Sequence, residues 1–198
     1  MTPRLLLLTD RSQLPLGRSL RATVTAAVTA GAADVLLREL DLRPAVRAAL
    51  SADLTASGAR VIAARGPLPG CVGVHLAAHQ PVTAAGGLPF GRSCHTVTAV
   101  AAAAAEGARW VTLSPFAASA SKPGRGPALA PDALAGPHPV PVLALGGIDA
   151  DNALDAVRAG ADGVAVMGAV MRAADPASTV ARLHDALAAT RAGGEGRR

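Results

Sequence analysis

Three side chains capable of acid–base or nucleophilic chemistry stand in a row at Ser93, Cys94 and His95, where an apolar run of the sequence ends. Adjacent residues of a strand point to opposite faces, so we do not expect Cys94 and His95 to form a nucleophile–base pair. An imidazole with a pKa of about 6.5 suits proton transfer in both directions near neutral pH. His95 is therefore a candidate catalytic residue. The alternative is that His95 only caps the helix that follows.

Glycines follow two later apolar runs, at Gly146-Gly147 and at Met167-Gly168. Because glycine has no side chain, backbone N–H groups there can approach an anion closely, and a helix that starts nearby adds partial positive charge. We predict that Gly146, Gly147, Met167 and Gly168 bind the phosphate group of a substrate. The alternative is that the glycines only form tight turns.

The segment from residue 114 to residue 126 is rich in hydroxyl groups and contains Lys122, the only lysine of the chain. Ser119, Ser121 and Lys122 have the chemistry to surround a phosphate or a pyrophosphate. The alternative is a solvated loop with an exposed lysine, and the sequence does not decide between the two.

Arginines close two further apolar runs, at Arg38 and Arg65, and we predict that both bind substrate. Because Glu39 follows Arg38, these two side chains could instead hold each other. His75 alternates with apolar neighbours inside its run, which favours a buried structural histidine over a ligand.

Eight short apolar runs alternate with stretches of helical periodicity, which indicates parallel strands joined by crossovers. The predicted strands are Leu5–Thr9, Val35–Glu39, Val61–Ala64, Val72–Leu76, Phe90–Ser93, Trp110–Ser114, Val142–Leu145 and Gly163–Met167. The predicted helices are Ser19–Ala30, Pro44–Ser57, Val97–Gly107, Asp151–Ala159 and Ala177–Thr190. The gaps that follow the third and fourth strands have room only for very short helices.

This pattern predicts an α/β fold, a single (β/α)8 TIM barrel over residues 1–192, with residues 193–198 as a disordered C-terminal tail. The alternative is an open doubly wound sheet. That fold usually carries GxGxxG after its first strand, where this chain has Thr9-Asp10-Arg11. In a barrel, the residues singled out above fall at or just after the carboxyl ends of strands, where the active sites of such barrels lie.

The composition excludes several classes of protein. The chain has 198 residues, 51% hydrophobic and 17% charged, which suits a globular domain and not a disordered chain. Its net charge of +5 comes from scattered arginines without a basic stripe, so we expect no nucleic-acid partner. Two cysteines are too few for a disulfide scaffold. We predict no signal peptide and no membrane span, and hence a cytoplasmic protein without a membrane partner.

Together these motifs resemble those of the thiamine phosphate synthase/TenI superfamily. Val35–Glu39 resembles its Val-Gln-Leu-Arg-Glu-Lys block, Gly73–Leu76 its fourth strand, and Leu145–Ile148 and Gly160–Met167 its last two strands. The resemblance implies a TIM barrel, a thiazole phosphate as the ligand and, since members are commonly dimers, a homodimer.

Two activities are known in this superfamily. Thiamine phosphate synthases join a pyrimidine methyl pyrophosphate to a thiazole phosphate with Mg²⁺, and their Thr-x-Thr-Lys loop is similar to residues 119–122. Their strand-five serine corresponds to Ser93, which implies that Ser93 is one of the catalytic residues. Their metal-binding Asn-Asp and second Asp, however, fall on Ala63, Ala64 and Gln80, and their pyrimidine-side Gln and Lys fall on Leu36 and Leu40. Alanine cannot ligate a metal ion.

TenI-type thiazole tautomerases need neither metal nor pyrimidine, and their Gly-Arg-Ser-x-His motif resembles residues 91–95. In that subfamily the histidine is implicated in moving the proton that aromatises a thiazole carboxylate phosphate, which implies the same role for His95. The sequence therefore favours a metal-free tautomerase without a cofactor. The alternatives are a thiamine phosphate synthase with a degraded Mg²⁺ site and a non-catalytic binder or regulator of phosphate ligands.

Overall fold

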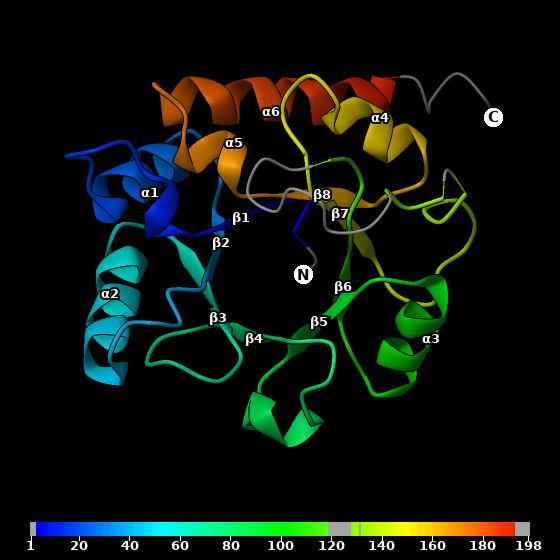
Figure 1. Cartoon of the computed structure of the whole chain (residues 1–198), viewed down its shortest axis with the longest axis horizontal. Coiled ribbons are helices and arrows are strands. Elements are labelled where there is room, and N and C mark those ends of the chain that lie inside the picture. The colour runs from blue at the N-terminus through cyan, green and yellow to red at the C-terminus, as the bar shows by residue number, and fades with distance from the viewer. Residues whose placement is uncertain (1–2, 119–127, 131, 193–198) are drawn as a thin grey trace.

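Eight parallel strands close into a barrel in the computed structural model of the chain, which describes residues 3–118, 128–130 and 132–192 (Figure 1). The strands pair in chain order, and β8 pairs with β1, with Leu6 opposite Ala165, to complete the ring. They are β1 (Leu5–Leu8), β2 (Asp34–Leu37), β3 (Arg60–Ala64), β4 (Gly73–Leu76), β5 (Phe90–Cys94), β6 (Trp110–Leu113), β7 (Val142–Leu145) and β8 (Gly163–Val166). The predicted (β/α)8 TIM barrel is confirmed.

Helices surround the ring of strands, with α6 lying alongside α1 and α4 (Figure 1). They are α1 (Leu20–Thr29), α2 (Pro44–Ala56), α3 (Val97–Ala105), α4 (Ala153–Arg158), α5 (Gly168–Met171) and α6 (Pro176–Ala192), with the short 3₁₀ helices η1 (Arg11–Gln13) and η2 (Val82–Ala85). The five predicted helices are present, with ends moved by up to two residues. Within the described residues, no helix is both long and apolar enough to cross a membrane.

The structure differs from the sequence prediction in one helix and in one strand end, and it decides one gap that the sequence left open. Residues 65–72, all of them described, contain no helix, so β3 connects to β4 by a loop alone. The short helix α5, directly after β8, was not predicted. Strand β2 ends at Leu37 and not at Glu39, because Glu39 adopts a left-handed backbone (φ 36°) that turns the chain out of the sheet.

Side-chain capping explains where two of the helices begin. The Ser19 hydroxyl accepts a hydrogen bond from the backbone N–H of Ala22 at the start of α1, and the Thr96 hydroxyl accepts one from Ala99 at the start of α3. Each hydroxyl satisfies a backbone donor that has no partner within its helix. Because Thr96 caps α3, the neighbouring His95 is not needed as a cap.

The inside of the barrel is filled by apolar side chains rather than left as a pore. Its buried cluster comprises Leu6, Leu8, Leu36, Ile62, Ala64, Trp110, Leu143 and Ala165. Trp110 fits because its neighbour in the sheet, Gly91, has no side chain: a Cβ on Gly91 would overlap the indole ring. A larger apolar cluster joins the outer faces of the strands to the helices. The carboxyl-end rim is therefore supported by a packed core.

Candidate active site

The floor of the barrel mouth is a polar cluster of His75, Ser93 and Thr112, supplied by β4, β5 and β6. The Nε2 atom of His75 lies 3.2 Å from the Ser93 hydroxyl oxygen and 3.2 Å from the Thr112 hydroxyl oxygen. Beneath them, the Trp110 ring stacks on His75 with 6.4 Å between ring centroids. His75 is buried, as the sequence predicted, and Ser93 is half-buried.

The environment of His75 keeps its imidazole neutral. Burial, and to a lesser extent the charge of Arg92, lowers the pKa of His75 to about 4. In a neutral ring the Nε2 atom either donates a proton or accepts one, and hydroxyl groups can do both, so Nε2 can orient the Ser93 and Thr112 hydroxyls in either tautomer. His75 therefore positions Ser93 and is itself too enclosed to reach a substrate.

His95 stands at the exit of β5 with an exposed side chain. Its Nδ1 atom lies 3.0 Å from the carbonyl oxygen of Ser114 and 3.2 Å from the Ser114 hydroxyl oxygen. A carbonyl oxygen only accepts hydrogen bonds, so Nδ1 must carry the proton when it bonds there. The Nε2 atom then presents a lone pair, and it has no hydrogen-bond partner among the described residues. This arrangement suits a general base.

Cys94, between these two residues, faces away from the mouth. It belongs to the apolar cluster under the helices and is fully buried. Burial raises the pKa of the Cys94 thiol to about 11, so the thiol stays protonated at neutral pH. The expectation that Cys94 and His95 do not pair is in accord with this geometry.

Arg38 leaves the end of β2 and reaches across the mouth. Its Nη1 atom lies 2.8 Å from the sulfur of Met167, after β8, and 3.8 Å from Oδ2 of Asp10, after β1. Its backbone N–H donates to the Thr9 hydroxyl at 3.0 Å. Burial alone would raise the pKa of Asp10, but hydrogen bonds from Ser12 and Gln13 and the charge of Arg38 lower it. A guanidinium thus stands beside the predicted phosphate turn.

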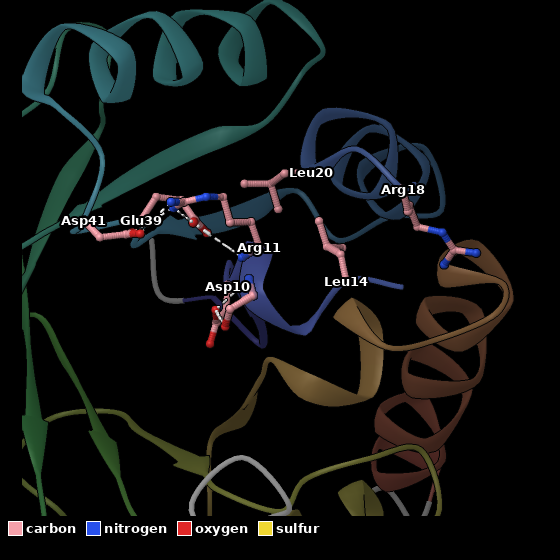
Figure 2. Close-up of a pocket in the computed structure, with 8 residues that line it drawn as sticks. Asp10, Arg11, Leu14, Arg18, Leu20, Glu39 and Asp41 are labelled. Atoms are coloured by element: carbon pink, nitrogen blue, oxygen red, sulfur yellow. Dashed lines mark hydrogen bonds and ion pairs between the residues drawn. The ribbon is translucent and has the colours of Figure 1, made fainter. Parts of the chain in front are cut away.

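Glu39 does not pair with Arg38, since the backbone turn sends the two side chains to different places. Glu39 is buried and accepts hydrogen bonds from the Arg11 backbone and guanidinium, the latter at 2.9 Å. Asp41 takes the other side of the same guanidinium (Figure 2). These residues line a pocket of about 500 Å³ beside the mouth. Two carboxylates neutralise Arg11, so this pocket has no free cation at Arg11 for an anionic ligand.

The turn after β7 is shaped by close packing against the connection that follows β6. Gly146 and Gly147 have φ angles of 98° and 65°, which favour glycine. A Cβ on Gly147 would lie 2.8 Å from the carbonyl oxygen of Ala117, and the Ala117 N–H donates to the Gly146 carbonyl at 3.0 Å. The glycines do form a tight turn, the alternative noted above, and their place at the rim remains compatible with phosphate binding.

Of the four remaining predicted residues, the structure describes only Arg65. Arg65 is exposed at the exit of β3, with φ 69°. Ser119, Ser121 and Lys122 lie outside the described residues. Their predicted contact with phosphate or pyrophosphate stays a prediction.

A further arginine of this rim, Arg92, has a structural role that the sequence reasoning missed. Arg92 is buried beneath the loop after β4; its Nη1 atom donates to the carbonyls of Ala77, Ala78 and Gln80 at 2.8–3.3 Å. Its Nη2 atom lies 2.6 Å from a carboxylate oxygen of Glu106. Arg92 alternates with Gly91 and Ser93 along β5, so its outward direction was predictable, but its partners were not.

Comparisons with known proteins agree with this architecture. A family model described as thiamine monophosphate synthase matches residues 70–170. A thiamine-phosphate synthase of Chloroflexus aurantiacus is 35% identical over 93% of this chain and 92% of its own length. The chain belongs to the thiamine phosphate synthase/TenI superfamily.

One further sequence relative and one solved structure extend the comparison. A thiamine-phosphate synthase of Methanoculleus marisnigri is 42% identical over 63% of this chain, and the alignment spans 64% of that relative's length. A solved structure, a thiamine phosphate pyrophosphorylase from Pyrococcus furiosus, superposes with a TM-score of 0.79 at 21% identity, covering 94% of this chain and 96% of that one. The two sequence relatives are both named thiamine-phosphate synthase.

The residues at the superfamily's metal positions do not fit Mg²⁺ in this chain. Ala63 and Ala64 are buried and offer no side-chain oxygen. Both ends of the Gln80 amide are occupied: Oε1 accepts from the Ala77 N–H at 2.9 Å, and Nε2 donates to the Arg65 carbonyl at 2.7 Å. Gln80 thus links the residue that follows β3 to the residue that follows β4 through its two hydrogen bonds. Within the described residues, no group of three His, Cys, Asp or Glu side chains is placed to hold a metal ion.

Proposed function

We propose that this chain is an enzyme of thiamine biosynthesis that binds a thiazole phosphate at the carboxyl end of its barrel. The contact of Arg38 with Met167 carries the proposal, because it places a guanidinium beside the β8 turn at which barrels of this kind bind phosphate. Ser93, held by His75, faces the same mouth. A phosphate at one side and a hydroxyl group at the floor would hold the ring between them.

Thiamine phosphate synthesis is the first candidate reaction. It is supported by relatives of that name, one of which aligns over nearly the whole chain. In this reaction a pyrimidine methyl pyrophosphate joins the thiazole phosphate and pyrophosphate leaves. Since the metal positions carry alanine and an engaged glutamine, basic side chains of the chain would meet the charge of the pyrophosphate.

Metal-free tautomerisation of a thiazole carboxylate phosphate is the second candidate, and the geometry of His95 favours it. The Ser114 carbonyl fixes the proton on Nδ1 and leaves the exposed Nε2 atom available to take a proton from a ring carbon and to return it elsewhere. Ser93 and Arg38 would orient the ring and its carboxylate. No step of this reaction requires a metal ion.

One set of assays separates these reactions. The purified protein is incubated with thiazole phosphate and pyrimidine methyl pyrophosphate, with and without Mg²⁺, and thiamine phosphate is measured. In parallel, deuterium exchange into a thiazole carboxylate phosphate is followed by NMR. Thiamine phosphate formation supports the first candidate, and exchange alone supports the second. Binding of a thiazole phosphate without either reaction would leave the non-catalytic binder, and absence of binding would refute the proposal.

A further inference from the structure

Arg172, the first residue after α5, lies at the predicted phosphate turn, although nothing in its sequence position singled it out. Its side chain is exposed, and its guanidinium lies over Gly168: a Cβ built on Gly168 would overlap it. The offset of four residues along a helical turn brings the two together. The backbone of Gly168 is helical and would accept any residue without strain. The obstacle to a side chain at this position is therefore the Arg172 guanidinium.

A chain of polar contacts links Arg172 to Arg38. The Nη1 atom of Arg172 donates to Oε1 of Gln13, and Nε2 of Gln13 donates to Oδ2 of Asp10 at 2.7 Å. The same Asp10 oxygen lies 3.8 Å from Arg38. The two guanidinium groups therefore flank the turn formed by Met167 and Gly168, with Arg38 against the sulfur and Arg172 over the glycine.

The charges around this turn do not cancel. Within the described residues, this group has two guanidinium groups and one carboxylate, that of Asp10. Glu39 and Asp41, the nearby acids, share the single cation Arg11, so these three residues carry one negative charge, and Arg18 beside them adds one positive charge. The hydrogen bond of the Arg172 guanidinium goes to the neutral amide of Gln13. Together these groups hold four guanidinium groups and three carboxylates, so one net positive charge remains for an anion.

Arg18 fixes the segment that carries Arg172. Its guanidinium donates to the carbonyls of Ala173 and Ala174, the latter at 2.9 Å, and so ties the β1–α1 connection to the α5–α6 connection (Figure 2). Because these two connections are joined, Gln13 and Arg172 stay side by side. The guanidinium is thus held near the turn before any ligand arrives.

We propose that Arg172 is a second guanidinium ligand for the phosphate group at the Met167–Gly168 turn, opposite Arg38. This inference rests on the proposed function for the identity of the substrate, but not for the presence of an anion site. On binding, phosphate oxygens would replace the Gln13 amide as the acceptor of the Arg172 N–H donors. A bond to an ionised oxygen is stronger than a bond to a neutral amide.

The test is isothermal titration of the full chain with thiazole phosphate, inorganic phosphate and pyrophosphate. We expect Arg172→Ala to weaken binding by about ten- to a hundredfold, and Arg172→Lys to retain part of the affinity. Gly168→Ala keeps the charge but displaces the guanidinium, so it should weaken binding as well. Arg158→Gln is the control: it removes an exposed arginine at the C-terminal end of α4 and should leave the affinity unchanged.

The outcomes separate this inference from the proposed function. If the wild type binds thiazole phosphate and the Arg172 and Gly168 variants bind it within twofold of wild type, the role of Arg172 is refuted and the function stands. If inorganic phosphate or pyrophosphate binds through Arg172 but thiazole phosphate does not bind, the function fails and the anion site stands. If none of the three binds, both fail. Should Arg172→Ala not fold, Arg172→Lys and Gly168→Ala carry the test.

Discussion

The imidazole of His75 lies 3.2 Å from the hydroxyl group of Ser93, and it is the buried member of this pair. Burial disfavours the charged form of the ring, so His75 stays neutral and holds the Ser93 hydroxyl by a hydrogen bond. Ser93, and not His75, lies at the barrel mouth. The Nδ1 atom of His75 has no hydrogen-bond partner among the described residues. The polar floor of the mouth is therefore built at some cost in stability, as polar groups at functional sites often are.

The depressed pKa of His75 predicts a stability that depends on pH. The unfolded chain binds a proton at His75 as the pH falls below about 6.5, whereas the folded chain does so only near pH 4. This contribution is therefore complete above about pH 6.5 and is lost as the pH falls towards 4, by about 3 kcal/mol in all. Urea unfolding at pH 7.5 and 4.5 should show this loss in the wild type and not in His75→Gln. The exposed control, His79→Gln, should behave as wild type; an equal loss in His75→Gln would contradict the assignment.

If the chain tautomerises its substrate, His95→Gln should slow deuterium exchange into the thiazole phosphate by about 10²- to 10⁴-fold, the usual contribution of a general base. The dissociation constant should change by less than about threefold, because the phosphate lies on other residues. Ser114→Ala is the matched control: it removes the hydroxyl group but keeps the carbonyl that holds Nδ1. Exchange at the wild-type rate in His95→Gln would exclude His95 as the base.

Removal of Mg²⁺ should leave ligand binding unchanged. Titration of pyrophosphate with Mg²⁺ or with EDTA should give the same affinity for the wild type, because Ala63 and Ala64 offer no ligand atom and the Gln80 oxygen is held by the Ala77 N–H. The double variant Ala64→Asp/Gln80→Asp restores two carboxylates and should gain Mg²⁺-dependent pyrophosphate binding. A wild-type affinity that drops tenfold in EDTA would show that carboxylates elsewhere bind the ion.

Gly91→Ala should destabilise the barrel by about 1–3 kcal/mol, because its Cβ would collide with the Trp110 ring in a closed core. Trp110→Leu in the same chain should restore part of this loss, since it removes the obstacle. Gly66→Ala is a matched control: the nearest atom to its Cβ is the Ala84 carbonyl oxygen, 3.8 Å away. Losses that simply add in the double variant would argue against direct contact.

Arg92→Met should lower the free energy of unfolding by about 2–4 kcal/mol, because three backbone carbonyls and Glu106 lose their buried partner. Arg109→Met, which removes an exposed arginine, should change it by less than about 0.5 kcal/mol. Thermal and urea unfolding measure both. Equal free energies of unfolding for the two variants would show that the hydrogen bonds of Arg92 to the loop after β4 do not stabilise the fold.

Most of the fold was predictable because local sequence patterns specify most of its strands and helices. Apolar runs of strand length alternate with helical periodicity, and Ser19 and Thr96 mark helix starts with the expected capping bonds. The end of β2 was not predictable in the same way. An apolar and charged run such as Val35–Glu39 reads as one strand, and only the left-handed backbone of Glu39 shows where pairing stops.

The same distinction, between what local sequence specifies and what the tertiary structure specifies, applies to the candidate site. The sequence by itself determined which chemical groups stand at the strand exits, among them Ser93, His95, Arg38 and the glycine turns, because in a parallel barrel all strand exits share one rim. It also determined that the metal positions carry no carboxylate. Only the tertiary structure decided which groups meet: Arg38 with Met167 and not Glu39, and Gln80 with the Arg65 carbonyl. Such pairings depend on side-chain directions and backbone turns between segments distant in the chain, and no local pattern of residues encodes those distances.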